Sequence, residues 1–259
     1  MKGLYIGAAG MMNYMKHLDV HSNNIANSET AGFKFDQLTS QAMSRKQVQF
    51  NQADSAKTIG SVDYAVHPNQ TFVNLKQGSM QVTGRDLDFF LHDADSEAGS
   101  SFFVAGKDGE TFLTRGGSFY SDQNGFLKTS DGANLLAENG TAIQVGAQTK
   151  ITVDTAGNIR RADTNELLGK LQTKFIAADQ RGNLEKNGLG QLTLKTGTIQ
   201  GLPAGRALIQ NGVLESSNVD MSTEMVELMD NQRMVQASSN IIKMFDTVYD
   251  KESSGLLRN

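Results

Sequence analysis

Two stretches of helical spacing, one near each end of the chain, constrain the fold more than any other feature. In the first stretch, seven residues are spaced alternately four and three apart: Leu4, Ala8, Met11, Met15, Leu18, Ser22 and Ile25. In the second stretch the alternation returns: Met221, Met225, Leu228, Gln232, Val235, Ser239, Ile242, Asp246 and Tyr249. This is the heptad spacing of helices that pack along a narrow seam. The sequence therefore predicts a helix at each end.

Both predicted helices are weak by themselves. Gly3, Gly7 and Gly10 each cost an isolated helix up to about 1 kcal/mol relative to Ala. Ser22 and Gln232 place polar side chains in the two stripes. Because such helices gain their stability mainly from packing, we expect them to bury their stripes against neighbouring copies of the chain. Packing of the two helices against each other within one chain is the alternative.

The C-terminal helix carries further apolar side chains beside its stripe: Val226, Met229, Ile241, Phe245 and Val248. These residues widen the apolar face and predict two contact surfaces instead of one. Asp220 has a side chain suited to an N-cap, and Glu224 in the first turn suits the helix dipole. At the other end of the chain, Asn and Thr side chains are expected to end the first helix, and Gly32 permits a tight reversal after it.

Between the helices the apolar period changes from 3.6 to about two residues. Short runs rich in Val, Ile, Phe, Thr and Leu alternate with two-residue turn signals at 108–109, 116–117, 124–125, 131–132, 139–140, 157–158 and 182–183. This pattern is typical of consecutive antiparallel hairpins. The predicted fold class is α+β, in which discontinuous N- and C-terminal helices form a coiled-coil-like layer and an all-β domain rich in antiparallel hairpins is inserted between them.

The same patterns divide the chain into four parts. We predict an N-terminal helix with an Asn-rich turn over 1–34, an extended connector over 35–66, a β-rich outer domain over 67–219, and over 220–259 a C-terminal helix that pairs with the first helix. The connector shows no sustained period, so it is expected to be extended or partly helical, and a linker of this length is usually functional or disordered when isolated.

Composition favours an ordered chain whose turns are made by Gly. Apolar residues make up 38% and charged residues 20% of the 259 residues, and 26 Gly stand against 2 Pro. A net charge of -4 without blocks of like charge gives no reason to expect nucleic acid or an anionic membrane as a partner. No run reaches the roughly 20 apolar residues that span a bilayer. The chain has no Cys, so disulfides and thiolate chemistry are excluded.

No set of residues predicts an active site, a cofactor site or a metal site. His17 and His21 are four apart on the predicted helix, a spacing that can bind zinc, but no third ligand is identifiable. Asp86 and Asp88 resemble paired carboxylates of a glycosidase, yet we expect both to be solvated. Residues 122–125 begin like a calcium loop but lack the closing Glu, so we interpret them as a hairpin turn. The expectation is that the protein is not an enzyme and takes no small-molecule substrate.

Particular segments of the chain resemble the flagellar rod and hook proteins. Residues 22–27 read SNNIAN and residues 30–34 read TAGFK, which is similar to the N-terminal signature of that family. Residues 212–220 read GVLESSNVD and resemble its C-terminal signature. In the middle, segments that resemble the β-domain of the FlgF and FlgG branches are DFFL at 88–91, FFV at 102–104, TRGGSF at 114–119, NGFL at 124–127 and SDG at 130–132.

The resemblance covers nearly the whole chain and is weakest from about 41 to 66. After Gln232 and Arg233 the family has a small residue and then an aromatic one, whereas Met234 and Val235 stand here. Ser238 replaces an Asn that the family pattern has. These departures concern the particular rod position, for which we favour the distal, FlgG-like type from length and general match. The alternatives are the proximal, FlgF-like type and a hook-family subunit.

The resemblance implies a structural axial subunit that self-assembles through its terminal helices and transmits torque. Its implied partners are further copies of itself, other axial proteins of the rod and hook, and the flagellar type III export apparatus, without direct membrane insertion. Its implied location is the basal body, outside the cytoplasm after export, with no cleaved signal peptide. The predicted assembly interface consists of Leu4, Ala8, Met11, Met15, Leu18, Ser22, Asn23, Asn24, Ile25, Asn27, Gly32, Phe33, Met225, Leu228, Gln232, Val235, Ile242, Phe245 and Tyr249.

Three other interpretations follow from parts of the sequence. The Gly-rich hairpins alone are compatible with an extracellular module that binds carbohydrate or a cell surface. Asp86 and Asp88 alone suggest a hydrolase, although no constellation supports one. The moderately apolar run over 3–12 resembles a short secretory signal, but its helical spacing continues to Ile25, which a cleaved signal does not require.

Overall fold

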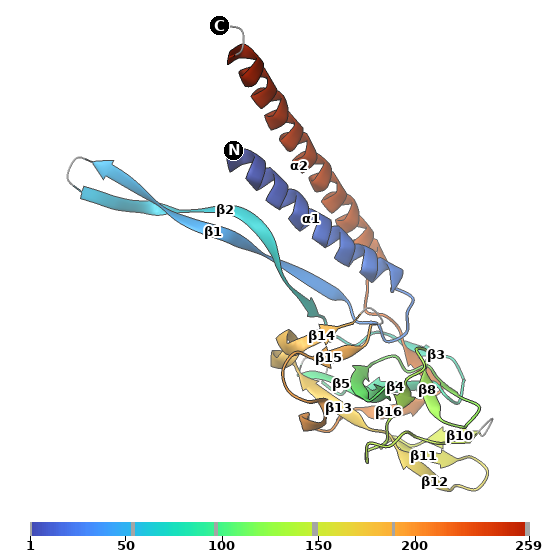
Figure 1. Cartoon of the computed structure of the whole chain (residues 1–259). Helices are drawn as coiled ribbons and strands as arrows, with labels where there is room; N and C mark the ends of the chain where they lie inside the picture. Colours follow the sequence, from blue (N-terminus) through green and yellow to red (C-terminus); the bar gives the residue numbers. More distant parts are fainter. Residues whose placement is uncertain (1, 53–54, 96–97, 147–149, 188–189, 257–259) are drawn as a thin grey trace. The chain divides into compact units, whose positions relative to one another are not determined.

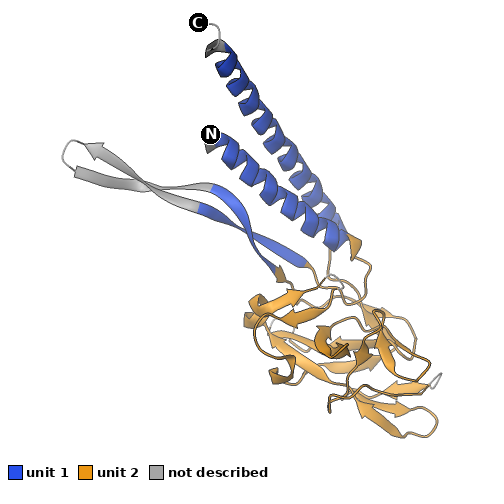
Figure 2. Cartoon of the chain, in the orientation of Figure 1, with its two compact units in different colours: residues 1–25, 36–71, 220–259 blue, residues 26–35, 72–219 orange. Residues whose placement is uncertain are grey.

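The computed structural model describes residues 2–52, 55–95, 98–146, 150–187 and 190–256, with side chains described for 3–43, 65–95, 98–146, 150–187 and 190–254. The chain divides into two compact units (Figure 2). Unit 1 comprises residues 1–25, 36–71 and 220–259, and unit 2 comprises residues 26–35 and 72–219. Each unit therefore takes its residues from distant parts of the chain.

Unit 1 is built from two long helices and a two-stranded sheet (Figure 1). The helices are α1, Lys2–Ala26, and α2, Met221–Leu256, and the strands are β1, Asp36–Gln52, and β2, Ser55–Val73. The expected helix is thus present at each end, and with antiparallel strands between the two helices the α+β class is confirmed. The segment 35–66, predicted as an extended connector, runs mainly through β1 and β2, and residues 257–259 lie outside the described part of the chain.

Asp220 caps the start of α2, as the sequence predicts. Its Oδ1 accepts hydrogen bonds from the backbone N–H of Ser222 (3.0 Å) and of Thr223 (3.4 Å), and its Oδ2 accepts one from the Thr223 hydroxyl (3.0 Å). These bonds, the one from the Thr223 hydroxyl first, lower the pKa of Asp220. The cap satisfies N–H groups that a helix start otherwise leaves without partners.

The other helix ends in the Asn-rich segment. α1 stops at Ala26, after which the Thr30 N–H donates to the Asn27 carbonyl (3.1 Å) and the Thr30 hydroxyl donates to Asn27 Oδ1 (3.2 Å). Gly32 has a φ of 72°, in the left-handed region, and a side chain there would collide with the backbone of Arg115 and Gly116. Only Gly satisfies both the dihedral and the close approach.

Unit 2 consists mostly of short strands. Their bounds are β3 Met80–Val82, β4 Phe89–His92, β5 Gly99–Lys107, β6 Glu110–Thr114, β7 Phe119–Ser121, β8 Leu127–Thr129, β9 Asn134–Leu135, β10 Ile151–Val153, β11 Asn158–Arg161, β12 Leu167–Lys170, β13 Thr173–Ala177, β14 Leu184–Lys186, β15 Leu192–Leu194, β16 Leu208–Asn211 and β17 Val213–Glu215. Two 3₁₀ helices, η1 Ala178–Asn183 and η2 Ile199–Gly201, interrupt them.

The largest sheet of unit 2 has eight strands, in the order β14-β15-β6-β5-β9-β8-β7, with β13 pairing beside β5. A three-stranded sheet, β10-β11-β12, and two strand pairs, β16-β4 and β17-β3, complete the described sheets. Both of these pairs are antiparallel and join a late strand to an early one. The last strands of unit 2 are therefore needed to complete sheets that begin more than a hundred residues earlier.

The turn signals of the sequence have different outcomes. Asp108 (φ 54°) and Gly109 (φ 85°) form the two-residue turn between β5 and β6, where Lys107 pairs with Glu110. Both left-handed dihedrals are those of the hairpin turn that an Asp-Gly pair favours. The hairpin expected at 182–183 is wrong, because these residues end η1, and the flanking strands β13 and β14 pair with β5 and β15 instead of with each other.

The core of unit 2 is apolar and rich in phenylalanine. The ring of Phe119 lies 5.5 Å from that of Phe89 and 5.4 Å from that of Phe103, measured between centroids. Aromatic pairs at such distances add to the stabilisation from burial alone. Ile209, on the late strand β16, is buried in this same cluster, so the core also includes the C-terminal part of the unit.

Candidate functional site

α1 and α2 contact each other through three glycines of α1. A side chain at Gly3 would overlap the ring of Phe245, one at Gly7 would lie 3.4 Å from Ile242 Cγ1, and one at Gly10 would lie 3.9 Å from Ser238 Oγ. Along this contact the residue numbers rise on α1 and fall on α2, so the two helices are antiparallel (Figure 1). The glycines that weaken an isolated α1 thus allow α2 to approach it closely.

At the other end of the helix pair the contact is polar. His21 Nδ1 lies 2.8 Å from Glu224 Oε2, and Asn24 Nδ2 donates to the same carboxylate oxygen at 3.0 Å. Asn24 is fully buried and also exchanges two hydrogen bonds with the backbone of Asp36 on β1. Buried polar groups that are satisfied in only one arrangement favour a single register of packing elements. This set of contacts therefore fixes α1 against α2 and β1 within unit 1.

A second polar chain joins α1 to β1. The Ser40 hydroxyl donates to Asn13 Oδ1 at 2.9 Å, and His17 Nε2 lies 2.9 Å from the same hydroxyl oxygen. Because a hydroxyl has one proton to donate, His17 Nε2 must be the donor in its bond with Ser40. Burial lowers the pKa of His17, the charge of neighbouring His21 lowers it further, and Glu227 opposes the effect.

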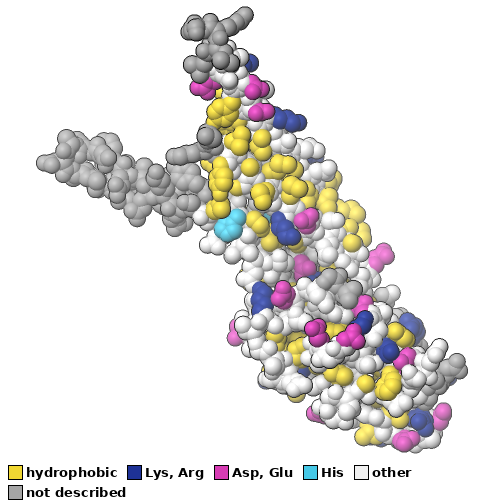
Figure 3. All heavy atoms as spheres, in the orientation of Figure 1, with side chains coloured by type: hydrophobic (Ala, Val, Ile, Leu, Met, Phe, Trp, Pro, Cys, Tyr) yellow, Lys and Arg dark blue, Asp and Glu magenta, His cyan; other side chains and the backbone are white. Residues whose placement is uncertain are grey.

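On the face shown in Figure 3, large apolar side chains gather along the helix pair, with charged side chains between them. Met12 of α1 is 70% exposed and Met244 of α2 is 60% exposed. The other large apolar residues exposed on the two helices are Leu4, Tyr5, Ile6, Met15, Met221, Met225, Val226, Met229, Met234, Ile241, Val248 and Tyr249. Exposed apolar patches of this extent are typical of surfaces that bind another macromolecule.

The stripe predicted on α1 lies one residue away from the contact with α2. Gly3, Gly7 and Gly10 face α2, whereas the predicted positions are the next residues along the chain. On α2, Phe245 and Ile242 belong to the predicted interface and contact α1. The residues of one predicted interface are thus divided between an internal contact and a surface that remains open in the single chain.

The remaining predicted interface residues differ in exposure. Asn24, Gly32 and Phe33 are buried, with Asn24 in unit 1 and the other two in unit 2. The exposed ones are Leu4, Met15, Ser22, Asn23, Met225, Gln232 and Tyr249. Those of intermediate exposure are Ala8, Met11, Leu18, Ile25, Asn27, Leu228, Val235, Ile242 and Phe245.

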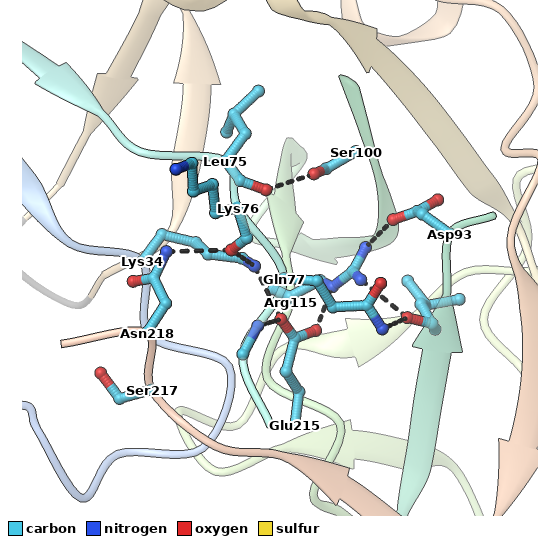
Figure 4. Close-up of polar contacts among 12 residues, drawn as sticks. Lys34, Leu75, Lys76, Gln77, Asp93, Ser100, Arg115, Glu215, Ser217 and Asn218 are labelled. Carbon is cyan, nitrogen blue, oxygen red and sulfur yellow. Dashed lines mark hydrogen bonds and ion pairs between the residues drawn. The ribbon is translucent and has the colours of Figure 1, made fainter. Parts of the chain in front are cut away.

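Unit 2 contains a buried group of four charged residues, which we call the charge cluster: Lys34, Asp93, Arg115 and Glu215 (Figure 4). Their side chains are only 1–3% exposed. Lys34 Nζ lies 2.7 Å from Glu215 Oε1, and Arg115 donates through Nε to Glu215 Oε2 and through Nη1 to Asp93 Oδ2 at 2.7 Å. Two cations therefore face two carboxylates without solvent.

Backbone groups satisfy the remaining donors and acceptors of the charge cluster. Lys34 Nζ donates to the Lys76 carbonyl at 2.7 Å, and Arg115 Nη2 donates to the Leu91 carbonyl at 2.7 Å. The Gly78 N–H donates to Glu215 Oε1 at 2.7 Å. Burial lowers the pKa of Lys34 to about 8, although the Glu215 carboxylate opposes this effect. Buried charges with this degree of pairing are costly to disrupt on one side only.

Sequence reasoning missed the charge cluster, and of the residues that make the polar contacts of the helix pair only Asn24 was predicted to lie in the interface. Lys34, Arg115 and Glu215 all lie in segments that resemble the rod and hook family, but none was predicted to be a site residue. A usable signal was present, because Lys34 stands between Phe33 and Phe35, where a solvated Lys is not expected.

The carboxylate pair considered for hydrolysis is not a catalytic pair in the structure. Asp88 is fully buried and accepts a hydrogen bond from the Thr83 hydroxyl at 2.6 Å, whereas Asp86 is exposed in a turn. The expectation that Asp88 is solvated is therefore wrong, because β4 begins beside it and carries it into the interior. Over the residues that the structure describes, no group of three or more His, Cys, Asp or Glu could hold a metal ion. Among the described helices, none has the length and apolarity to cross a membrane.

Comparison with known proteins matches the chain at both ends and in the middle. Residues 4–34 match the family described as flagella basal body rod protein, residues 98–161 match the D1 domain of flagellar hook protein FlgE/F/G, and residues 210–255 match the flagellar basal body rod FlgEFG protein C-terminal family. The two terminal matches cover most of α1 and α2, and the middle match lies in unit 2.

Individual relatives align over almost their whole length. The flagellar basal-body rod protein FlgG of Bacillus subtilis is 30% identical, with 96% of each chain covered. The flagellar basal-body rod protein FlgF of Caulobacter vibrioides is 30% identical over 98% of this chain and 96% of its own. The flagellar hook-basal body complex protein FlhP of Bacillus subtilis is 24% identical over 95% and 96%.

Terminal helices with apolar outer sides, together with these matches, define a structural protein of the flagellar rod and hook class. Within that class, the chain belongs to the flagellar basal-body rod protein family.

Proposed function

We propose that the protein is an axial subunit of the flagellar rod that self-assembles through the outer sides of its terminal helices and transmits torque. The observation that carries the proposal is the distribution of side chains on the helix pair. Glycine and polar side chains of α1 face α2, and large apolar side chains remain exposed on both helices. Contact with further copies removes these apolar side chains from water, which stabilises the assembly.

The proposed assembly interface includes the predicted stripe and the exposed residues beside it. Met15 of α1 is 49% exposed and Met225 of α2 is 46% exposed, and both belong to the stripe. Methionine packs adaptably against differently shaped neighbours, which suits a subunit that meets several copies. In the assembly, the α1–α2 pairs would form a coiled-coil-like inner layer, as predicted for the segments 1–34 and 220–259, and the segment 67–219 would be an outer domain.

The proposed location is the basal-body rod, outside the cytoplasm after export through the flagellar type III apparatus. The names of the relatives support rod location, since they are basal-body rod and hook-basal body complex proteins. The proposed partners are other copies and the adjoining rod and hook proteins.

We favour the distal, FlgG-like position, supported by FlgG relatives from several organisms that align over nearly their full length. The FlgF-like proximal position is the alternative, supported by the Caulobacter vibrioides relative at the same 30% identity. Expression in two strains, one lacking the distal and one lacking the proximal rod subunit, distinguishes them. Restored motility in the second strain alone would favour the alternative.

The main proposal is tested by placing charge on the outer side of each helix. Met15→Glu and Met244→Glu, expressed in cells that lack the chromosomal copy, should abolish motility and recovery of the chain in purified basal bodies. Gln236→Glu is the matched control, because Gln236 is already exposed and polar on α2. Circular dichroism should show that unit 2 stays folded in all three variants. Normal incorporation of both Met variants would contradict the proposal.

A further inference from the structure

The charge cluster joins parts of unit 2 that lie far apart in the chain (Figure 4). Glu215 is 181 residues from Lys34 and 100 residues from Arg115. It lies on β17, the last strand of the unit. Lys34 and Arg115 therefore acquire their shared carboxylate only when the final strand is in place.

Without Glu215 the charges of the cluster do not balance. Lys34 and Arg115 would then share Asp93 alone, with the side chains of both cations nearly fully buried. Removing one partner from a buried ionic group is strongly destabilising, because it leaves a charge without solvent or counter-charge. The native arrangement of the residues that precede β17 is thus unfavourable in free energy until Glu215 is bound in the charge cluster.

Backbone contacts of the same strand reinforce this dependence. The Gly32 N–H donates to the Glu215 carbonyl at 2.7 Å, and the Ser216 N–H donates to the Ser79 carbonyl at 2.8 Å. A side chain at Gly78 would overlap the Ser216 carbonyl, so the two segments lie in close contact. The last strand consequently holds both the segment 26–35 and β3.

The neighbouring late strand completes the core as well as a sheet. β16 pairs with β4 from Leu208↔His92 to Asn211↔Phe89. Ile209 on β16 is buried in the phenylalanine cluster. Residues 208–219 therefore supply a core side chain, two strand partners and the shared carboxylate.

We propose that docking of residues 208–219, with Glu215 entering the charge cluster, is the step that closes unit 2, so that the unit becomes stable in one cooperative event. Before this step, the backbone amides of β5 and β6 lack the protection from hydrogen exchange that they have in the native unit, although these two strands form a local hairpin. The proposal depends on contacts within unit 2 and is independent of the proposed function. If the proposal holds, unit 2 remains unfolded in a chain from which residues 208–219 are still absent, for example while the chain is being synthesised.

Pulse-labelled hydrogen exchange during refolding of the full chain tests the order of events. Two backbone amides report on it: Val104 on β5, which donates to the Gln172 carbonyl at 3.1 Å, and Ser216, which donates to Ser79. We expect both amides to gain protection with the same time constant, within a factor of two. Protection of Val104 in a phase ten or more times faster than that of Ser216 would overturn the proposal.

Charge variants of the full chain test the role of Glu215. Glu215→Gln keeps the shape of the side chain but removes its charge, and at equilibrium it should lower protection of both amides together by at least 100-fold. Glu185→Gln, at an exposed position on β14, is the control and should leave both unchanged. Loss of protection at Ser216 alone would contradict a shared closing step.

A paired substitution separates charge balance from shape. Lys34→Met combined with Glu215→Leu leaves Arg115 and Asp93 as a neutral pair, and apolar replacement of buried ion pairs is commonly tolerated. We expect this variant to regain at least tenfold of the protection lost in Glu215→Gln. A double variant no better than Glu215→Gln would show that charge balance does not govern closure. Where Glu215→Gln fails to fold, the refolding experiment on the unaltered chain decides.

Discussion

His21 and Glu224 are 203 residues apart, yet His21 Nδ1 lies 2.8 Å from a carboxylate oxygen of Glu224 in unit 1. The Glu224 side chain is 5% exposed and accepts a second hydrogen bond from Asn24. At the opposite end of the helix pair, Gly3 admits the ring of Phe245. The helix pair is therefore held by two different means, a polar contact at one end and close glycine packing at the other.

Loss of the Glu224 carboxylate should loosen the polar end of the helix pair. Glu224→Ala removes the acceptor of His21 and one of the two acceptors of the buried Asn24 side chain, a change that costs about 1–3 kcal/mol. Hydrogen exchange of the α1 amides in the full chain should become faster near His21. Glu227→Ala, at an exposed position one turn later, should stay within about 0.5 kcal/mol of the unaltered chain. If the α1 amides near His21 exchanged equally fast in both variants, the contact of Glu224 with His21 and Asn24 would not stabilise the helix pair.

Alanine at two glycines of α1 should have unequal effects. Gly10→Ala meets only ordinary contact at Ser238 and should stabilise the helix by up to about 1 kcal/mol, because Ala favours helix more than Gly. Gly3→Ala introduces a methyl group that overlaps the Phe245 ring, so the ring must move and the gain should be smaller or reversed. Thermal unfolding followed by helical circular dichroism compares the two. A larger gain at Gly3 is incompatible with the close packing described here.

Local signals in the sequence were sufficient for the helices, their ends and the hairpin at 108–109. Asp220 as a cap and Asp-Gly as a turn depend on the chemistry of one or two residues, so spacing and residue type predict them. The charge cluster could not be predicted in the same way. Lys34 and Glu215 are partners only after the sheets have formed, and nothing within a few residues of either identifies the other.

Apolar periodicity also missed the face of α1 that contacts α2. Apolar periodicity identifies the most apolar stripe, but α2 packs on the neighbouring stripe of Gly3, Gly7 and Gly10. Close approach of two backbones favours small residues, which carry no hydrophobic signal. A search for glycines at helical spacing would have found the internal contact, and the apolar stripe would then have remained for other partners.

Titration of Lys34 should make unit 2 more stable in mild alkali. Burial lowers the pKa of Lys34 from its ordinary value of 10.5 to about 8. Between these values the folded chain has lost the proton that the unfolded chain retains, so stability rises with pH across that window. The contribution of this one group is about 3 kcal/mol at most. Below pH 8 both states hold the proton, and the group adds no pH dependence.

The measurement is urea unfolding of the full chain at pH 7.5 and at pH 10, compared with Lys34→Met. The variant has no proton to lose at this position, so it should lack the part of the rise in unfolding free energy that Lys34 contributes between pH 7.5 and pH 10. The other titrating groups act equally on both chains. Lys186→Met is a less suitable control because Lys186 lies over the Phe33 ring, so exposed Lys107→Met is preferable. An identical rise in the unaltered chain and in Lys34→Met would refute the assignment.

Titration of His17 should make the helix pair less stable in mild acid. Burial and the charge of His21 lower the pKa of His17 below its ordinary value of 6.5. As pH falls from 6.5 towards the lowered pKa, the unfolded chain binds a proton that the folded chain does not, so stability falls with pH in that window.

His17→Gln retains an amide donor for Ser40 but cannot titrate. Between pH 7.5 and 5.5, the thermal midpoint of helix unfolding should therefore drop further in the unaltered chain than in His17→Gln. The titratable groups that act on His17, namely His21 and Glu227, are present in both chains. Equal drops would therefore mean that His17 is not the group responsible.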